Sequence, residues 1–117
     1  MRVETIVGML EKPWAGQMSG VAVLVVGSAD EGLLARTLAR HSAKVVQVVF
    51  TEAQYHETEK LRPQALDLSI RLSDELTSLL ISRHFDLIVA LNVPDIVAEG
   101  VSVVNLNYTD GEYHWVQ

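Results

Sequence analysis

The chain contains no cysteine among its 117 residues. Disulfide bonds, thiolate metal ligands and cysteine nucleophiles are therefore excluded. Basic residues are also few, because 9 lysine and arginine residues stand against 15 aspartate and glutamate residues, for a net charge of −6. Contacts to a phosphate backbone depend on clustered lysine and arginine side chains. Nucleic-acid binding is consequently not expected of this protein.

Long uncharged apolar runs are missing as well. The apolar run within residues 86–93 is too short to span a bilayer, and residues 1–10 carry Glu4 and lack a signal-peptide pattern. We therefore expect no membrane association and a cytoplasmic location. Hydrophobic residues make up 49% of the chain, which at this length is enough for the core of one globular domain.

Two apolar segments and the helix between them form the centre of the predicted fold. Residues 21–26 are continuously apolar and mostly β-branched, and residues 44–50 form a second apolar segment. Such segments are typical of strands that are buried on both faces of a sheet. Between them, Leu34 and Leu38 recur at helical spacing. A strand, a helix and a second strand in this order predict a βαβ unit with parallel strands.

The remaining elements are predicted from shorter patterns. Before the βαβ unit we expect a strand over residues 2–10 and a connector over residues 11–20. After it, we expect a surface helix over 53–61, a strand over 65–72, a helix capped by Ser73, a buried strand over 86–91, a helical turn over 94–100, a strand over 101–108 and a returning strand over 112–117.

The order of the strands follows from how each is patterned. Residues 65–72 alternate between apolar and polar, which indicates an edge strand with one wet face, whereas residues 86–91 indicate a central strand. This difference favours the order 3-2-1-4-5 over 2-1-3-4-5. The predicted fold class is α/β, a three-layer Rossmann-like domain with a mostly parallel sheet and a C-terminal antiparallel hairpin. Residues 1–20 precede its core of residues 21–108, and residues 109–117 complete the hairpin.

Residues 27–32, with the sequence GSADEG, are the most informative loop. Ser28 and Glu31 have the spacing of a capping box, in which each side chain binds a backbone N–H of the first helical turn. Alternatively, the loop lines a ligand crevice at the carboxyl end of the first strand. Asp30 and Glu31 would repel phosphate there, and no phosphate-binding glycine motif is present. Carboxylates suit ribose hydroxyls, amines or a cationic centre.

Other candidate residues are scattered along the chain. Glu52 follows the second strand, where an acidic residue can accept hydrogen bonds from a ribose diol, or it simply begins the next helix. The histidines show no i,i+4 pair, so we expect no metal site; they are His41, His56, His84 and His114. No nucleophile elbow of the G-x-S-x-G type occurs.

Two stretches resemble a known family. GLLARTLARHSAKVVQVVFTEA looks like the first βαβ unit of class I S-adenosylmethionine-dependent methyltransferases, and HFDLIVALNVPDIV resembles their fourth-strand motif. In such enzymes an acidic residue ends the second strand, and here the acid stands at Glu52. The resemblance implies S-adenosylmethionine as cofactor. The strand carboxyl ends then supply the predicted cofactor-binding residues, which are Gly27, Ser28, Asp30, Glu52 and Asn92.

Two functions remain open from the sequence. One is a small Rossmann-like domain that binds a nucleoside-type ligand, as a minimal or degenerate methyltransferase. The other is a non-catalytic assembly or regulatory module that keeps the fold without a small-molecule site. The aromatic residues of the C-terminal hairpin, Tyr108, Tyr113 and Trp115, either pack against the sheet and the N-terminal segment or form a self-association surface. We expect a homo-oligomer.

Overall fold

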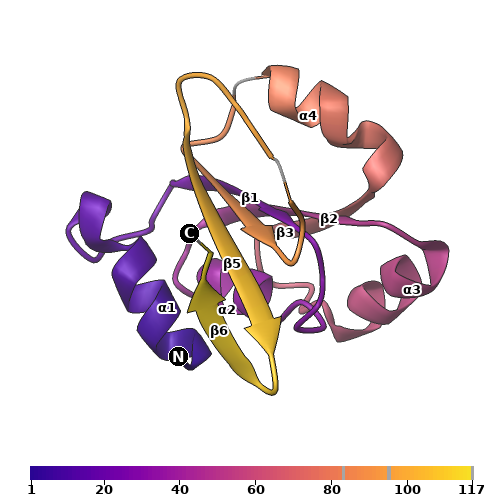
Figure 1. Ribbon diagram of the computed structural model, residues 1–117, viewed down its shortest axis with the longest axis horizontal. Helices are drawn as coiled ribbons and strands as arrows, with labels where there is room; N and C mark the ends of the chain where they lie inside the picture. Colours follow the sequence, from indigo (N-terminus) through magenta and orange to yellow (C-terminus); the bar gives the residue numbers. More distant parts are fainter. Residues whose placement is uncertain (83, 95, 117) are drawn as a thin grey trace.

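A computed structural model describes residues 1–82, 84–94 and 96–116 (Figure 1). In these residues the chain forms a six-stranded sheet of order β3-β2-β1-β4-β5-β6. Neighbours from β3 to β5 pair in parallel, and β6 pairs antiparallel with β5. The predicted strand order and the C-terminal antiparallel hairpin are confirmed. The strands are β1 (Ala22–Val26), β2 (Lys44–Val49), β3 (Leu68–Leu72), β4 (Leu87–Leu91), β5 (Ser102–Thr109) and β6 (Glu112–Trp115).

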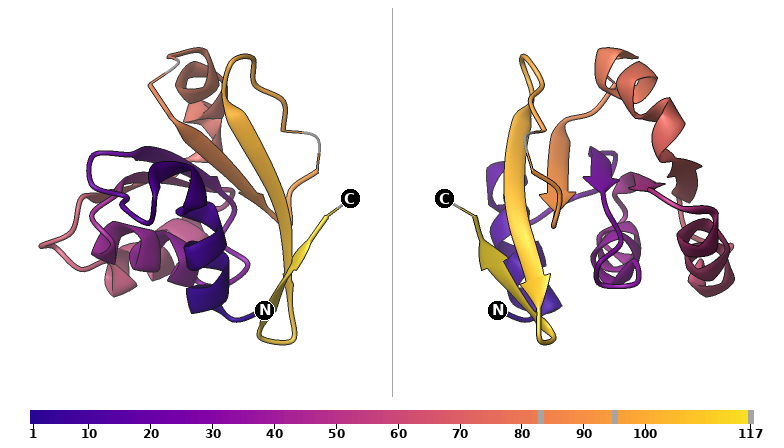
Figure 2. Two further views of the ribbon diagram at one scale, coloured as in Figure 1. Left: turned by 90° about the vertical axis from the view of Figure 1, so that its left-hand side faces the viewer. Right: turned by 45° about the vertical axis from the view of Figure 1, so that its right-hand side comes forward.

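Helices cover the two faces of this sheet and make a three-layer arrangement. α1 (Val3–Leu10), α2 (Leu33–Arg40) and α3 (Glu52–Leu61) lie on one side, and α4 (Leu76–Ser82) lies on the other (Figure 2). Because successive side chains of a strand point to opposite faces, β1 contributes to both layers. Val23 and Val25 join the larger core cluster, and Leu24 joins the smaller one beneath α4. The fold is Rossmann-like, as predicted.

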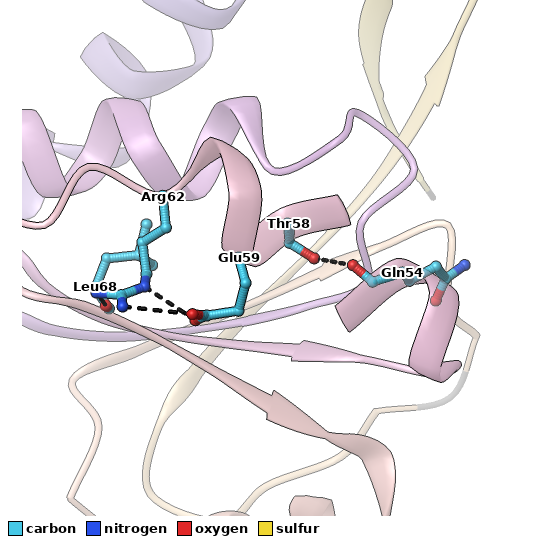
Figure 3. A network of polar contacts seen from close by, with 5 residues as sticks. All are labelled: Gln54, Thr58, Glu59, Arg62 and Leu68. Carbon is cyan, nitrogen blue, oxygen red and sulfur yellow. Dashed lines mark hydrogen bonds and ion pairs between the residues drawn. The ribbon is translucent and has the colours of Figure 1, made fainter. Parts of the chain in front are cut away.

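The third strand lies at the sheet edge, where the alternating sequence placed it. Figure 3 shows polar contacts along α3 and at its end, where Arg62 reaches β3. Arg62 donates from Nε to Oε1 of Glu59 at 2.9 Å, and from Nη1 to the carbonyl oxygen of Leu68 at 3.4 Å. One turn earlier, the Thr58 hydroxyl donates to the carbonyl of Gln54. Arg62 therefore holds the end of the surface helix against the first residue of β3.

The strand predicted over residues 2–10 is wrong, because these residues form α1. Val3, Ile6, Val7 and Leu10 are buried, and their spacing of i, i+3, i+4 and i+7 places them on one helix face. That face packs toward α2 and β6. A short 3-10 turn, η1 (Lys12–Trp14), follows within the predicted connector.

Two further local predictions need correction. Ser73 does not cap a helix with its side chain; it begins a 3-10 turn, η2 (Ser73–Glu75), that continues into α4. The helical turn predicted over residues 94–100 is not formed in the part that the structure describes, where Pro94 and residues 96–98 are irregular. Asp95 lies outside the described residues. The described residues between β4 and β5 therefore add no helix to the layer containing α4.

The outer edge of β6 is partly covered by the start of the chain. Met1 and Tyr113 exchange two backbone hydrogen bonds, at 2.7 and 2.8 Å. Trp115 and Val116 remain 42% and 46% exposed. Strand addition at this edge would displace Met1, and the homo-oligomer stays a prediction. Among the described residues, no helix combines the length and the apolar character needed to cross a membrane.

Candidate functional site

The order of the sheet reverses between β1 and β4, and ligands of open α/β sheets bind outside the strand ends at such a point. Gly27 lies there, directly after β1. Its N–H donates to the carbonyl of Val48 at 2.8 Å, and its carbonyl accepts from Nε2 of Gln47 at 3.1 Å. A Cβ at Gly27 would lie 2.3 Å from the carbonyl oxygen of Leu91 and 3.3 Å from Cγ2 of Val93. The chain therefore leaves β1 pressed against the end of β4.

Asp30 shapes the β1–α2 loop, which we define as residues 27–32. Its carboxylate accepts from the N–H of Gly32 at 3.0 Å and from the N–H of Leu34 at 2.8 Å. The residue is 6% exposed. The predicted Ser28–Glu31 capping box is wrong, because the N–H groups of Gly32 and Leu34 at the start of α2 bind the side chain of Asp30 instead. Glu31 has φ +57° and is exposed, and its backbone N–H donates to the carbonyl of Ser28.

A tyrosine from the C-terminal hairpin completes the coordination of this carboxylate. The Tyr113 hydroxyl donates to Oδ2 of Asp30 at 2.5 Å, although 83 residues separate the two in sequence. Tyr113 is 1% exposed, so the predicted packing of hairpin aromatics is confirmed for this residue. Burial raises the pKa of Tyr113 well above its usual value, and the neighbouring Asp30 carboxylate raises it further. Asp30 thus accepts three hydrogen bonds from within the protein.

The raised pKa of Tyr113 predicts a loss of stability in alkali. Above about pH 10 the unfolded chain releases this phenolic proton, whereas the folded chain retains it. The free energy of unfolding should therefore fall by about 1.4 kcal/mol per pH unit in this range. Urea unfolding at several pH values between 9 and 11.5 measures the slope. In the variant Tyr113→Phe, the free energy of unfolding should fall less steeply with pH, by about 1.4 kcal/mol per pH unit. Equal slopes in the two proteins would contradict the prediction.

Asn92 fixes the end of β4 to β5. Its side-chain oxygen accepts from the N–H of Tyr108 at 2.6 Å, and its Nδ2 donates to the carbonyl of Tyr108 at 3.1 Å. Its own N–H donates to the carbonyl of Leu106 at 2.9 Å. Beside it lies a cavity of about 540 Å³ between β5 and the segment that follows β4; among its lining residues are Asn92, Val93, Ile96, Asn105 and Asn107.

Ser28 lies on the side of the β1–α2 loop that faces α3, and Glu52 lies on α3 itself. Ser28 and Glu31 border a narrow cavity of about 50 Å³, together with Gln54, Glu57, Thr58 and Leu61 of α3. Glu52 is the exposed first residue of α3, after Thr51, whose hydroxyl accepts from the N–H of Gln54 at 3.1 Å. A carboxylate in the first helical turn suits the positive end of the helix dipole.

The structure thus gathers most of the predicted site at one end of the sheet. Gly27, Ser28 and Asp30 share the β1–α2 loop, and Gly27 lies against Leu91, the residue before Asn92. Glu52 stands apart, after β2. On the other flank of the loop, Ala29, Asp30, Glu31, Leu33, Arg36 and Tyr108 border a cavity of about 320 Å³.

Among the residues that hold this loop, sequence reasoning missed Gln47 and Tyr113. Gln47 is 1% exposed and binds the Gly27 carbonyl. Its signal was a lone polar residue inside the apolar segment KVVQVVF. The sequence placed Tyr113 either in packing against the sheet or in a self-association surface, and nothing in it indicated Asp30 as its partner. Within the described residues, no group of three histidine, aspartate or glutamate side chains is placed to hold a metal ion.

The strand order, the layers and the glycine turn after β1 define a Rossmann-like domain of the kind found in S-adenosylmethionine-dependent methyltransferases. No protein-family model matches the sequence, and no curated protein matches it significantly. The likeness therefore comes from solved structures, and at the identities found it concerns the fold alone.

One similar structure is a mutant of MtNAS in complex with S-adenosylmethionine. It has a TM-score of 0.64 and 14% sequence identity, over 88% of this chain and 45% of that chain. Another is an S-adenosylmethionine-dependent methyltransferase from Mesorhizobium loti, with a TM-score of 0.59 and 14% identity, over 97% of this chain and 65% of that chain. This chain therefore spans less than two thirds of the length of either protein.

Proposed function

We propose that this protein binds S-adenosylmethionine, or a closely similar nucleoside-type ligand, at the carboxyl ends of β1, β2 and β4. One observation carries the proposal. The β1–α2 loop is anchored from both sides at the point where the strand order reverses, with Gly27 against the end of β4 and Asp30 at the start of α2. The fold shared with a structure that holds S-adenosylmethionine supports the same placement.

The charges around the loop favour the chemistry of this ligand. Glu31, Glu52 and Glu57 are exposed carboxylates on the loop and on the first turns of α3. They disfavour a ligand that is held by its phosphates, since like charges repel. S-adenosylmethionine instead offers ribose hydroxyls, an ammonium group and a sulfonium cation, each of which a carboxylate stabilises.

Different roles follow for the five predicted residues. The side chain of Asp30 binds backbone N–H groups and the Tyr113 hydroxyl, and the side chain of Asn92 binds the backbone of Tyr108. In this proposal both residues position the site rather than contact the ligand. Gly27 allows the close passage of the chain. Ser28 and Glu52 are left to contact the ligand, Glu52 at the ribose hydroxyls.

The test is a thermal-shift and calorimetric titration with S-adenosylmethionine, S-adenosylhomocysteine, NAD and ATP. A ligand at a hundred times its Kd stabilises the folded state by about 2.7 kcal/mol, which raises the Tm measurably. We expect this response with the first two compounds. Glu52→Ala and Ser28→Ala should each weaken binding about ten-fold, the worth of one hydrogen bond to a charged or polar ligand group.

The matched control is Glu4→Ala, which removes an exposed carboxylate from α1 and should leave the affinity unchanged. No response to any of the four compounds would overturn the proposal and favour the assembly or regulatory module. Binding that is equally strong in Glu52→Ala, Ser28→Ala and Glu4→Ala would show that the ligand lies elsewhere.

A further inference from the structure

The hydrogen bond between Tyr113 and Asp30 joins the C-terminal hairpin to the β1–α2 loop. Tyr113 lies on β6 at the edge of the sheet, and its ring packs against that of Tyr108 with centroids 4.7 Å apart. Its backbone is held on one side by the pairing with β5 and on the other by Met1. The phenol is therefore fixed by its surroundings before it meets the carboxylate of Asp30.

At the other end of this contact, the loop backbone adopts conformations that are not favoured on their own. Glu31 and Gly32 have consecutive positive φ angles of 57° and 82°. A non-glycine residue in this region is strained by about 1–2 kcal/mol and persists when its surroundings determine it. Here Asp30 holds the N–H groups on either side of the turn into α2, those of Gly32 and Leu34.

We propose that Tyr113 is a positioning residue for the ligand site, and that the C-terminal hairpin acts as a latch on the β1–α2 loop. The Tyr113 hydroxyl fixes Asp30, Asp30 fixes the backbone from Gly32 to Leu34, and this backbone sets where Ser28 and Glu31 stand. The part of this inference that concerns ligand affinity rests on the proposed function. The part that concerns the loop does not.

Coupling of this kind is reciprocal. If an intact latch strengthens ligand binding, then bound ligand must protect the latch by the same free energy. Ligand should accordingly slow the exchange of the Gly32 and Leu34 amide hydrogens in the wild-type protein. It should also slow exchange at Tyr113, on the far side of the contact.

The experiment is amide hydrogen exchange, followed residue by residue, in the full chain and in Tyr113→Phe. Removing the hydroxyl deletes one hydrogen bond to a buried carboxylate and keeps the packing of the ring. The Gly32 and Leu34 amides should then exchange about ten-fold to a hundred-fold faster. Binding of S-adenosylmethionine, measured in the same proteins, should weaken about ten-fold. Tyr55→Phe is the control, because it removes the hydroxyl of a partly buried tyrosine on α3 without touching Asp30.

The outcomes separate the latch from the ligand. Unchanged exchange at Gly32 and Leu34 in Tyr113→Phe would overturn the latch, whatever the protein binds. An equal increase throughout β1 and β4 would also overturn it, since the hydroxyl would then serve global stability alone. If the wild-type protein binds no S-adenosylmethionine, the proposed function fails while faster exchange at these two amides still supports the latch. Faster exchange with unchanged ligand affinity would reject Tyr113 as a positioning residue.

Discussion

Replacing Gly27 by alanine is expected to lower the free energy of unfolding by at least about 3 kcal/mol, because overpacking and backbone strain act together. The new Cβ would lie 2.3 Å from the carbonyl oxygen of Leu91, and this oxygen belongs to the backbone of a central strand and cannot rotate away. Gly27 also has φ +106°, a conformation that residues with a side chain rarely adopt. Urea denaturation followed by circular dichroism gives the change in free energy.

Gly20→Ala is the matched control for this prediction. Gly20 also has a positive φ, of 78°, but a Cβ there would meet no atom within 4 Å. The control therefore carries the backbone strain without the collision, and it should lose only about 1–2 kcal/mol. Equal losses in the two variants would show that β1 and β4 separate readily, and that the close passage at Gly27 does not constrain the site.

The order of the strands was predictable because the pattern of apolar and polar residues in each strand indicates whether one or both of its faces are buried. Residues 21–26 and 86–91 are apolar throughout, apart from Asp86 at the start of the second segment. In the third strand, by contrast, Ser69 and Arg71 alternate with apolar residues. A strand of the second kind cannot occupy the centre of a three-layer sheet without burying Arg71. The order 3-2-1-4-5 follows from this single exclusion.

The failure at α1 has an equally local cause. Val3, Ile6 and Val7 are β-branched residues, which are typical of strands, and the segment is only 8 residues long. The helical spacing was present in the sequence, but one repeat of it does not outweigh this composition. Contacts with α2 and β6 decide the outcome, because they bury one face of the segment and leave Glu4 in solvent. Tertiary packing here overrides intrinsic propensity.

The position of the candidate site could be predicted from the sequence, but the hydrogen bonds that hold its loop could not. Gly27 at the end of an apolar segment marks the turn, so its place could be inferred. Which side chain caps α2 could not, since Ser28, Asp30 and Glu31 are all capping residues within one hexapeptide. The choice depends on Gly32, whose φ of +82° turns the chain so that Asp30 faces the free N–H groups. Nothing local indicated Tyr113, which arrives from 83 residues away.

The consequence for function is a loop whose shape is set before any ligand arrives. Gln47 holds the Gly27 carbonyl, Asp30 holds the start of α2, and Arg36 donates from Nη1 to the carbonyl of Glu31 at 2.6 Å. Ordering a flexible segment on binding reduces affinity. In the proposed function, a loop held in this way avoids most of that loss.

Asp30→Ala, like Gly27→Ala, should be severely destabilised. Its free energy of unfolding should fall by about 3–5 kcal/mol, because three donors lose their acceptor at once. Two of these are the backbone N–H groups of Gly32 and Leu34, and the third is the buried Tyr113 hydroxyl. A buried donor that is left without a partner is destabilising by about 1–3 kcal/mol. Equilibrium unfolding in urea, with the fold of the variant checked by circular dichroism, measures the loss.

Glu31→Ala is the control, since it removes the neighbouring, exposed carboxylate and should change stability by no more than about 0.5 kcal/mol. The double variant Asp30→Ala, Tyr113→Phe isolates the shared contact. Both single changes delete the same hydrogen bond, so the double variant should be more stable than the sum of the single losses implies, by about 1–3 kcal/mol. Strictly additive losses would mean that Asp30 caps α2 independently of the hairpin, and that the long-range hydrogen bond contributes nothing to holding the β1–α2 loop.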